Sequence, residues 1–139
     1  MPRDNAVADT GKFQKELNSG ILSLIVLSIL RVQGEQYGYD LVRMITSEDG
    51  EAFPMTQGAV YPVLRSLEKQ KLLISRLQPS EAGPPRKYYR VTPAGELAFK
   101  HWSDAWYFSV SVVNRFVPDP AHAQNIRPSL GRRTIPNST

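Results

Sequence analysis

The chain has 139 residues, 41% of them hydrophobic, which is the size of a single domain that can bury a core. It contains no cysteine, and this excludes disulfides, thiolate metal sites and a cysteine nucleophile. The net charge of +4 is unevenly spread, because residues 56–91 hold seven Lys and Arg against two Asp and Glu. Such asymmetry is typical of a surface that binds a polyanion.

The N-terminal part of the chain predicts a flexible leader followed by a long helix. Residues 1–10 mix charges without an apolar core, so no signal peptide is expected. Apolar residues then recur at helical spacing from Lys12 to about Val32, and Gly34 ends this helix. Its apolar run, residues 21–30, is shorter than the roughly 20 residues that span a bilayer. We therefore expect a buried helix in a cytoplasmic protein that has no membrane partner.

Two shorter helices are predicted next. One fits Tyr39 to about Ser47, and the other begins near Thr56 as its N-cap. Pro62 is unfavourable inside a helix because it lacks the N–H donor, so we expect an irregular opening with Pro62 in the first regular turn. The spacing places an apolar stripe on one side of this helix and an aromatic and basic stripe on the other. The stripes are Val60, Val63, Leu64 and Leu67, and Tyr61, Arg65 and Lys69.

A β-hairpin follows the third helix. Residues 72–78 alternate between two faces like a half-buried strand, and residues 86–91 form the return strand. Between them lies a proline-rich and glycine-containing turn, residues 79–85, which is too long for a tight hairpin. We expect the hairpin tip to project, and we expect Tyr88 and Tyr89 to lie on opposite faces of the strand.

The last predicted helix is opened by Thr92 as N-cap and Pro93 as first helical residue, and it extends to about Val117. Apolar residues cover more than one of its sides, so it needs a partner, and homodimerisation is the natural way to bury them. Residues 118–139 are proline-rich and predict a disordered tail. The predicted dimer contacts are Phe13, Leu17, Trp102, Trp106, Val110, Val113 and Val117.

Together these elements predict a mainly α fold of α+β type. We expect a winged helix-turn-helix domain with a two-stranded wing over residues 11–92, followed by a long dimerisation helix over residues 93–117. A half-buried helix followed by a basic hairpin suits a protein that binds double-stranded DNA.

The third helix and the hairpin supply the candidate DNA contacts. Gln57 can hydrogen-bond an adenine edge or a phosphate, and Arg65 can contact guanine or phosphate. Tyr61 can reach a phosphate or a thymine methyl group. Structural interpretations remain open as well: packing of Tyr61 on Pro62, and an ion pair between Arg65 and Glu68. The predicted DNA-binding residues are Thr56, Gln57, Tyr61, Arg65, Lys69, Arg76, Arg86 and Lys87.

Three motifs in this order resemble those of the PadR-like transcriptional regulators. They are the segment 37–41 at the start of the second helix, a Gly-x-x-Tyr-Pro-x-Leu-x-x-Leu-Glu core at 58–68, and Arg-Lys-Tyr-Tyr-x-x-Thr-x-x-Gly at 86–95. The single C-terminal helix resembles the short subgroup of that family. The resemblance implies a homodimer formed through the first and last helices, which represses nearby genes.

The resemblance further implies that a small aromatic or amphipathic effector releases the DNA, and that tryptophan of the last helix stacks on it. Trp106 is the better candidate for this ligand-binding role. Trp102 is either part of the same platform or a core anchor at the dimer interface. The operator, the effector and the direction of regulation stay open at this point.

Two other classes of function fit the sequence less well. A winged-helix adaptor that binds protein predicts a neutral or acidic third helix, and the excess of cations over residues 56–91 argues against it. An enzyme is not expected, because the chain has no glycine-rich phosphate loop, no Ser-x-x-Lys and no His-Glu-x-x-His motif. His101 and His122 have no carboxylate at ligand spacing, so neither a metal nor another cofactor is expected.

Overall fold

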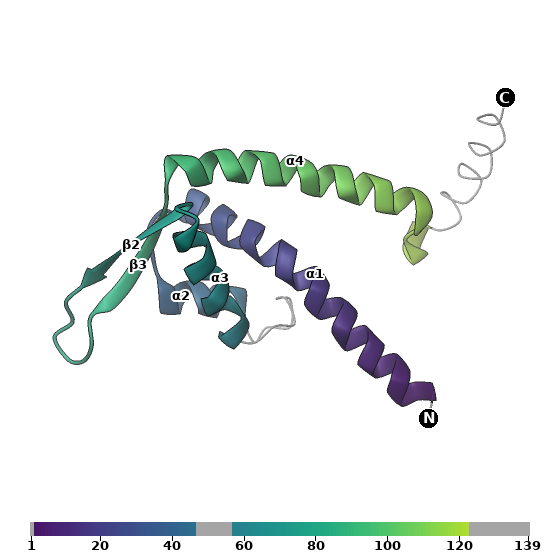
Figure 1. Ribbon diagram of the computed structural model, residues 1–139, viewed down its shortest axis with the longest axis horizontal. Helices are drawn as coiled ribbons and strands as arrows, with labels where there is room; N and C mark the ends of the chain where they lie inside the picture. The colour runs from purple at the N-terminus through teal and green to yellow at the C-terminus, as the bar shows by residue number, and fades with distance from the viewer. Residues whose placement is uncertain (1, 47–56, 123–139) are drawn as a thin grey trace. The chain divides into compact units, whose positions relative to one another are not determined.

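The computed structural model describes residues 2–46 and 57–122. Over these residues the chain has four α-helices and one three-stranded antiparallel sheet, which is a winged helix and confirms the predicted fold class (Figure 1). Two compact units meet within the last helix, the first ending at Lys100 and the second beginning at His101. The elements are α1 Pro2–Gln33, β1 Gln36–Tyr37, α2 Gly38–Ile45, α3 Gln57–Lys69, β2 Leu73–Gln78, β3 Arg86–Val91, α4 Pro93–Phe116 and the short 3-10 helix η1 Pro120–His122.

Helix α1 begins earlier than the sequence indicated. It starts at Pro2, so residues predicted as a flexible leader are helical. Proline is well suited to a first helical position, because its missing N–H has no partner there in any case. The predicted end is confirmed: Gly34 has a φ of +81°, and its N–H donates to the carbonyl of Leu30 over 2.9 Å.

The core of the first unit lies where α1, α2, α3 and the sheet meet. The ten-residue apolar run of α1 supplies its centre, and Val26 and Leu27 are fully buried. The apolar stripe predicted for α3 also faces inward, with Val60 and Leu64 fully buried. The buried apolar residues are Leu22, Val26, Leu27, Leu30, Leu41, Val42, Ile45, Val60, Leu64, Leu67, Leu73 and Tyr89.

Helix α1 also meets the length and composition expected of a membrane span over Gly11–Gln33, with a mean hydropathy of 1.3. The core helix of a soluble protein meets the same criteria. Leu22 and Leu30 of this segment are 2% and 3% exposed, packed in the core of the winged helix. This packing supports the assignment of α1 as a core helix.

Helix α3 differs from the prediction at its start. It is helical from Gln57, and Pro62 is therefore the sixth residue of the helix rather than part of its first turn. Pro62 has no N–H to donate to the carbonyl of Gly58. Both residues are exposed, so water can take the place of that donor. The predicted N-cap, Thr56, lies outside the described residues.

The sheet contains a strand that sequence patterns did not reveal. Its order is β1-β3-β2, where β1 pairs with β3 through Gln36 opposite Tyr89 and Tyr37 opposite Tyr88. The wing therefore rests on a third strand, although a two-stranded wing was predicted. The predicted return strand is confirmed, as is the alternation of the two tyrosines, because Tyr89 is 4% exposed in the core while Tyr88 lies on the opposite face.

The start of α4 is built as the sequence predicts. Thr92 Oγ1 accepts a hydrogen bond from the N–H of Gly95 over 3.0 Å and donates to the carbonyl of Lys71 over 2.7 Å. A Cβ added at Gly95 would lie 2.2 Å from the carbonyl oxygen of Leu72, so only glycine allows this close approach. The helix ends at Phe116, one residue before the predicted end.

Candidate nucleic-acid interface

Helix α3 presents opposite chemistry on its two sides. The buried side chains anchor it in the core, while Arg65 and Lys69 are exposed and Tyr61 is half-buried. Within the described part of the chain Arg65 has no ion-pair partner, so the pair with Glu68 weighed from the sequence does not form. The exposed side of α3 therefore carries a guanidinium available to a ligand.

The hairpin is attached to the end of α3 by Glu68. One carboxylate oxygen accepts from the hydroxyl of Ser75 on β2, and the other lies 3.3 Å from Nζ of Lys87 on β3. Burial works to lower the pKa of Lys87, but Tyr89 and Glu68 together outweigh it, so the pKa of Lys87 is raised and the ammonium stays charged. Glu68 thereby orients Lys87, one of the predicted DNA contacts.

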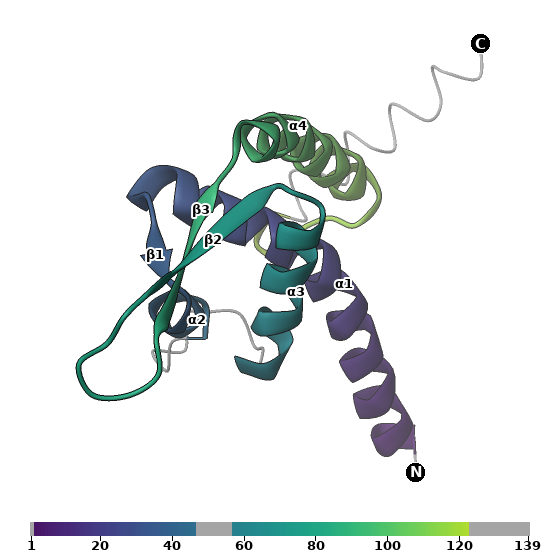
Figure 2. The ribbon, with the colours of Figure 1, turned by 60° about the vertical axis from the view of Figure 1, so that its left-hand side comes forward.

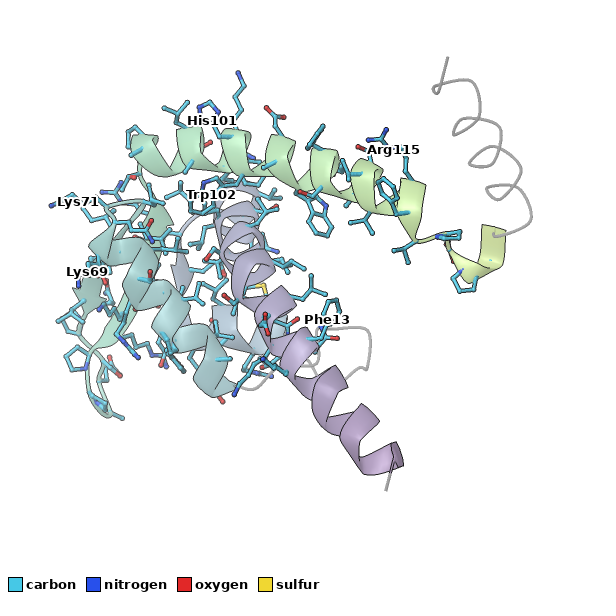
Figure 3. All side chains as sticks on the ribbon, turned by 45° about the vertical axis from the view of Figure 1, so that its right-hand side comes forward. Phe13, Lys69, Lys71, His101, Trp102 and Arg115 are labelled. Atoms are coloured by element: carbon cyan, nitrogen blue, oxygen red, sulfur yellow. The ribbon has the colours of Figure 1, made fainter. Side chains whose placement is uncertain are left out.

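The N-terminal end of α3 and the tip of the β2–β3 hairpin point toward the same side of the first unit (Figure 2). A single duplex can therefore meet both. Lys69 and Lys71 lie at the other end of α3, where the chain turns into β2 (Figure 3). Lys71 adopts a φ of +65° in that turn. Of the basic residues predicted on α3, Arg65 is thus closer than Lys69 to the side where the hairpin tip projects.

Arg76, one of the predicted DNA contacts, is paired with an acid of the turn before β1. Its guanidinium makes two hydrogen bonds to the carboxylate of Glu35, of 2.9 and 2.7 Å, and lies 4.9 Å from the ring centroid of Tyr88. The hydrogen bond from Arg76 lowers the pKa of Glu35, so the carboxylate stays ionised at neutral pH. Arg76 therefore connects β2 to the turn before β1, and its charge is already balanced by Glu35.

A basic and aromatic group on α2, β1 and β3 combines the predicted contact Arg86 with three residues that were missed from the sequence, Tyr37, Tyr39 and Arg43. Arg86 lies over the ring of Tyr37 at 5.0 Å, and Arg43 lies over the ring of Tyr39 at 5.8 Å. The two rings are 5.9 Å apart. The signal that could have revealed part of this group is the four-residue spacing of Tyr39 and Arg43, which places them on one side of a helix.

Two predicted contacts cannot be placed. Thr56 lies outside the described residues, and the structure describes Gln57 by its backbone as the first residue of α3. His122, one of the two histidines at which no metal is expected, is likewise described by its backbone alone. Over the part of the chain that the structure describes, no His, Asp and Glu side chains gather into a set that could hold a metal ion.

The second unit presents large apolar side chains on α4. Trp106 is 38% exposed, and Tyr107 and Phe108 are each 70% exposed. Trp102 and His101 project from opposite sides of the helix (Figure 3). The remaining predicted dimer contacts are half-buried at Val110 and exposed at Phe13, Leu17, Val113 and Val117.

Comparison with known proteins places this geometry among transcription factors. Residues 26–101 match the model of the transcriptional regulator PadR-like family. A PadR family transcriptional regulator from Eggerthella lenta is 32% identical with a TM-score of 0.68, and the match covers 85% of this chain and 97% of that one.

Two further solved structures agree. A transcriptional regulator from Clostridium thermocellum is 29% identical with a TM-score of 0.64, covering 73% of this chain and 98% of that one. A PadR-like transcriptional regulator from Bacillus cereus is also 29% identical with a TM-score of 0.60, covering 75% of this chain and 98% of that one.

Proposed function

Because the chain belongs to the PadR-like family of transcriptional regulators, and is thus a DNA-binding regulator and not an enzyme, we propose that it is a dimeric, sequence-specific repressor. A small effector bound near the dimer interface releases it from DNA. The observation that carries the proposal is the exposed Arg65 on α3, opposite the buried face, beside a hairpin that Glu68 ties to the same helix.

This arrangement supports binding in two grooves. A helix fits the major groove, where a guanidinium can bond bidentately to guanine, and an adjoining hairpin reaches phosphates or the minor groove. In a homodimer, two copies of α3 about 34 Å apart would meet successive major grooves on one side of the duplex. Such a protein acts in the cytoplasm and has no membrane partner.

The exposed aromatic residues of α4 support the dimer and effector parts of the proposal. Trp106, Tyr107 and Phe108 form more apolar surface than one isolated helix can keep in water at no cost. A second copy of α4 would cover part of it, and a flat aromatic effector would stack on Trp106 and Trp102. The effector acts by binding more tightly to one separation of the two α3 helices than to the other.

The first experiment measures binding to the DNA upstream of the protein's own gene by fluorescence anisotropy, across a salt series. Competitor random duplex and the Arg65→Ala variant are measured in parallel. We expect a steep salt dependence and an Arg65→Ala loss of roughly 1–3 kcal/mol on the specific site. The loss on random duplex should be smaller, since Arg65 is proposed to contact a base.

Equal affinity for the upstream DNA and for random duplex at every salt concentration would contradict specific binding at that site. If in addition selection from a random duplex library enriched no sequence, the alternative function would be favoured, which is a winged-helix adaptor that binds protein. If Arg65→Ala bound the specific site as tightly as wild type, α3 would not be the element that reads the DNA sequence.

A further inference from the structure

The face of the wing sheet opposite its buried side carries a row of three tyrosine rings. Tyr88 of β3 pairs with Tyr37 of β1, and their ring centroids are 5.6 Å apart. The row continues to Tyr39 at the start of α2, whose centroid is 5.9 Å from that of Tyr37. We call these three residues the tyrosine row. It joins the wing to the first helix of the helix-turn-helix.

Each ring of the tyrosine row has a guanidinium over it. Arg76 lies over Tyr88, but its charge is balanced by the ion pair with Glu35. The other two guanidinium groups, of Arg86 and Arg43, are exposed, and neither forms an ion pair within the described ranges. The row therefore presents two uncompensated guanidinium groups, over Tyr37 and Tyr39.

The geometry indicates which ligand these two groups fit. A guanidinium that lies on a ring uses one of its faces, so the N–H groups along its edge remain available to an acceptor. Their fork matches two oxygens of a phosphate. The ring also restricts the long arginine side chain before binding, and this lowers the entropy lost when a ligand is bound. A phosphodiester is the ligand that suits both groups.

The position of the row links it to the DNA-binding elements. α2 packs against β1, β3 and α3. A Cβ added at Gly38, the first residue of α2, would lie 3.0 Å from the ring of Tyr89 and 3.6 Å from the carbonyl oxygen of Lys87. The start of α2 is therefore held closely against the wing strand that carries Arg86 and Lys87.

From these observations we propose that Arg43 and Arg86, held over Tyr39 and Tyr37, form a phosphate clamp that binds the backbone of duplex DNA beside the segment contacted by α3. The clamp rests on the proposed DNA-binding function and extends it to α2, which carries no predicted contact. It contributes affinity and register without sequence readout, because it contacts phosphates only.

The test compares Arg43→Gln with wild type in anisotropy titrations at several salt concentrations, on the specific duplex and on random duplex. The slope of log K against log[salt] should fall by about 0.9 for the lost phosphate contact, equally on both duplexes. Lys100→Gln is the matched control: it removes one positive charge at the start of α4, beyond the end of β3 away from the hairpin tip. Its slope should equal that of wild type.

A second pair of variants tests the ring itself. Tyr39→Phe keeps the aromatic face and should bind DNA like wild type, whereas Tyr39→Leu removes the face and should weaken binding several-fold. Tyr39 is 47% exposed, so both variants should fold, and thermal unfolding by circular dichroism checks this. Equal affinities of the Phe and Leu variants would overturn the role of the ring.

The outcomes separate this inference from the proposed function. Specific binding that depends on Arg65, together with an unchanged slope of Arg43→Gln, would overturn the clamp and leave the function standing. Equal losses of slope for Arg43→Gln and Lys100→Gln would also overturn it, because the effect would then be one of net charge. A wild-type protein that binds no duplex would overturn both the clamp and the function.

Discussion

At the scale of single residues, the basic side chains differ in whether an acidic side chain pairs with them. Arg65 and Arg43 have no ion-pair partner among the described residues, whereas Arg76 is held by Glu35. Lys87 lies between these two cases, because it is paired with Glu68 and its side chain is still exposed to solvent. Basic residues that look alike in the sequence thus differ in the structure in whether an acid pairs with them.

The ion pair between Arg76 and Glu35 predicts a pH dependence of stability. The pKa of Glu35 is lowered in the folded chain, so the unfolded chain binds the proton more tightly. The pair therefore stabilises the fold fully above the ordinary carboxyl value of 4.5, and this stabilisation is lost as the pH falls through the lower folded value. We expect Glu35→Gln to lower the melting temperature at pH 7, and we expect its difference from wild type to shrink as the pH falls below 4.5.

Differential scanning calorimetry of Glu35→Gln and wild type at pH 7 and at a series of lower pH values measures this difference. Glu81→Gln is a suitable control, because Glu81 is exposed in the hairpin turn and forms no ion pair in the described structure. A gap between Glu35→Gln and wild type that did not shrink as the pH falls would show that the carboxylate charge is not its cause.

At the scale of elements, two helix ends determine how the winged helix is connected to α4. Thr92 caps α4 and also binds the carbonyl of Lys71, so one side chain links the start of α4 to the turn before β2. Arg31 at the end of α1 adds an ion pair to Glu96 with a distance of 2.7 Å, and its guanidinium lies over the ring of Phe99. The first turns of α4 are thus fastened to both α1 and the wing.

Gly95 makes this junction testable. In Gly95→Ala the added methyl group would meet the carbonyl oxygen of Leu72 at 2.2 Å, so backbone must move, and we expect a destabilisation of about 1–3 kcal/mol. Gly20→Ala on α1 meets nothing within 4 Å and should stabilise by roughly 0.5–1 kcal/mol. Urea unfolding curves of the two variants measure both effects, and a neutral Gly95→Ala would contradict the close packing.

At the scale of the whole molecule, the proposed repressor needs a surface for a second copy and a surface for an effector. The exposed aromatic residues of α4 are proposed to serve both. Trp106 is therefore proposed to contribute to ligand stacking and to dimer stability. Measurements of dye binding and of DNA binding distinguish the two contributions.

We expect Trp106→Ala to weaken the binding of a planar acridine dye, measured by dye anisotropy without DNA, by about 0.5–1.5 kcal/mol. Trp106→Phe keeps an aromatic face and should lose less. DNA affinity should stay close to that of wild type. Equal losses of dye binding and DNA binding would instead make Trp106 a structural residue of the dimer.

Much of the fold could be predicted because its signals are local. The helical spacing in α3, the cap at Thr92, the glycine at the end of α1 and the strand Arg86–Val91 each depend on neighbouring residues, and each is found in the structure. The missed strand, Gln36–Tyr37, is two residues long and shows no period. It forms because β3 supplies a partner edge.

The candidate site likewise has features that local sequence signals predict and features that depend on contacts between distant segments. The sequence by itself determined the family, the winged helix and the group of basic residues on α3 and the hairpin, since these follow from composition, spacing and motif order. Only the tertiary structure decided that Glu35 engages Arg76, that Glu68 turns toward the wing, and that Arg43 joins Arg86 along the tyrosine row. The reason is physical: pairing of charges and rings depends on distances between segments far apart in the chain, and no local pattern encodes those distances.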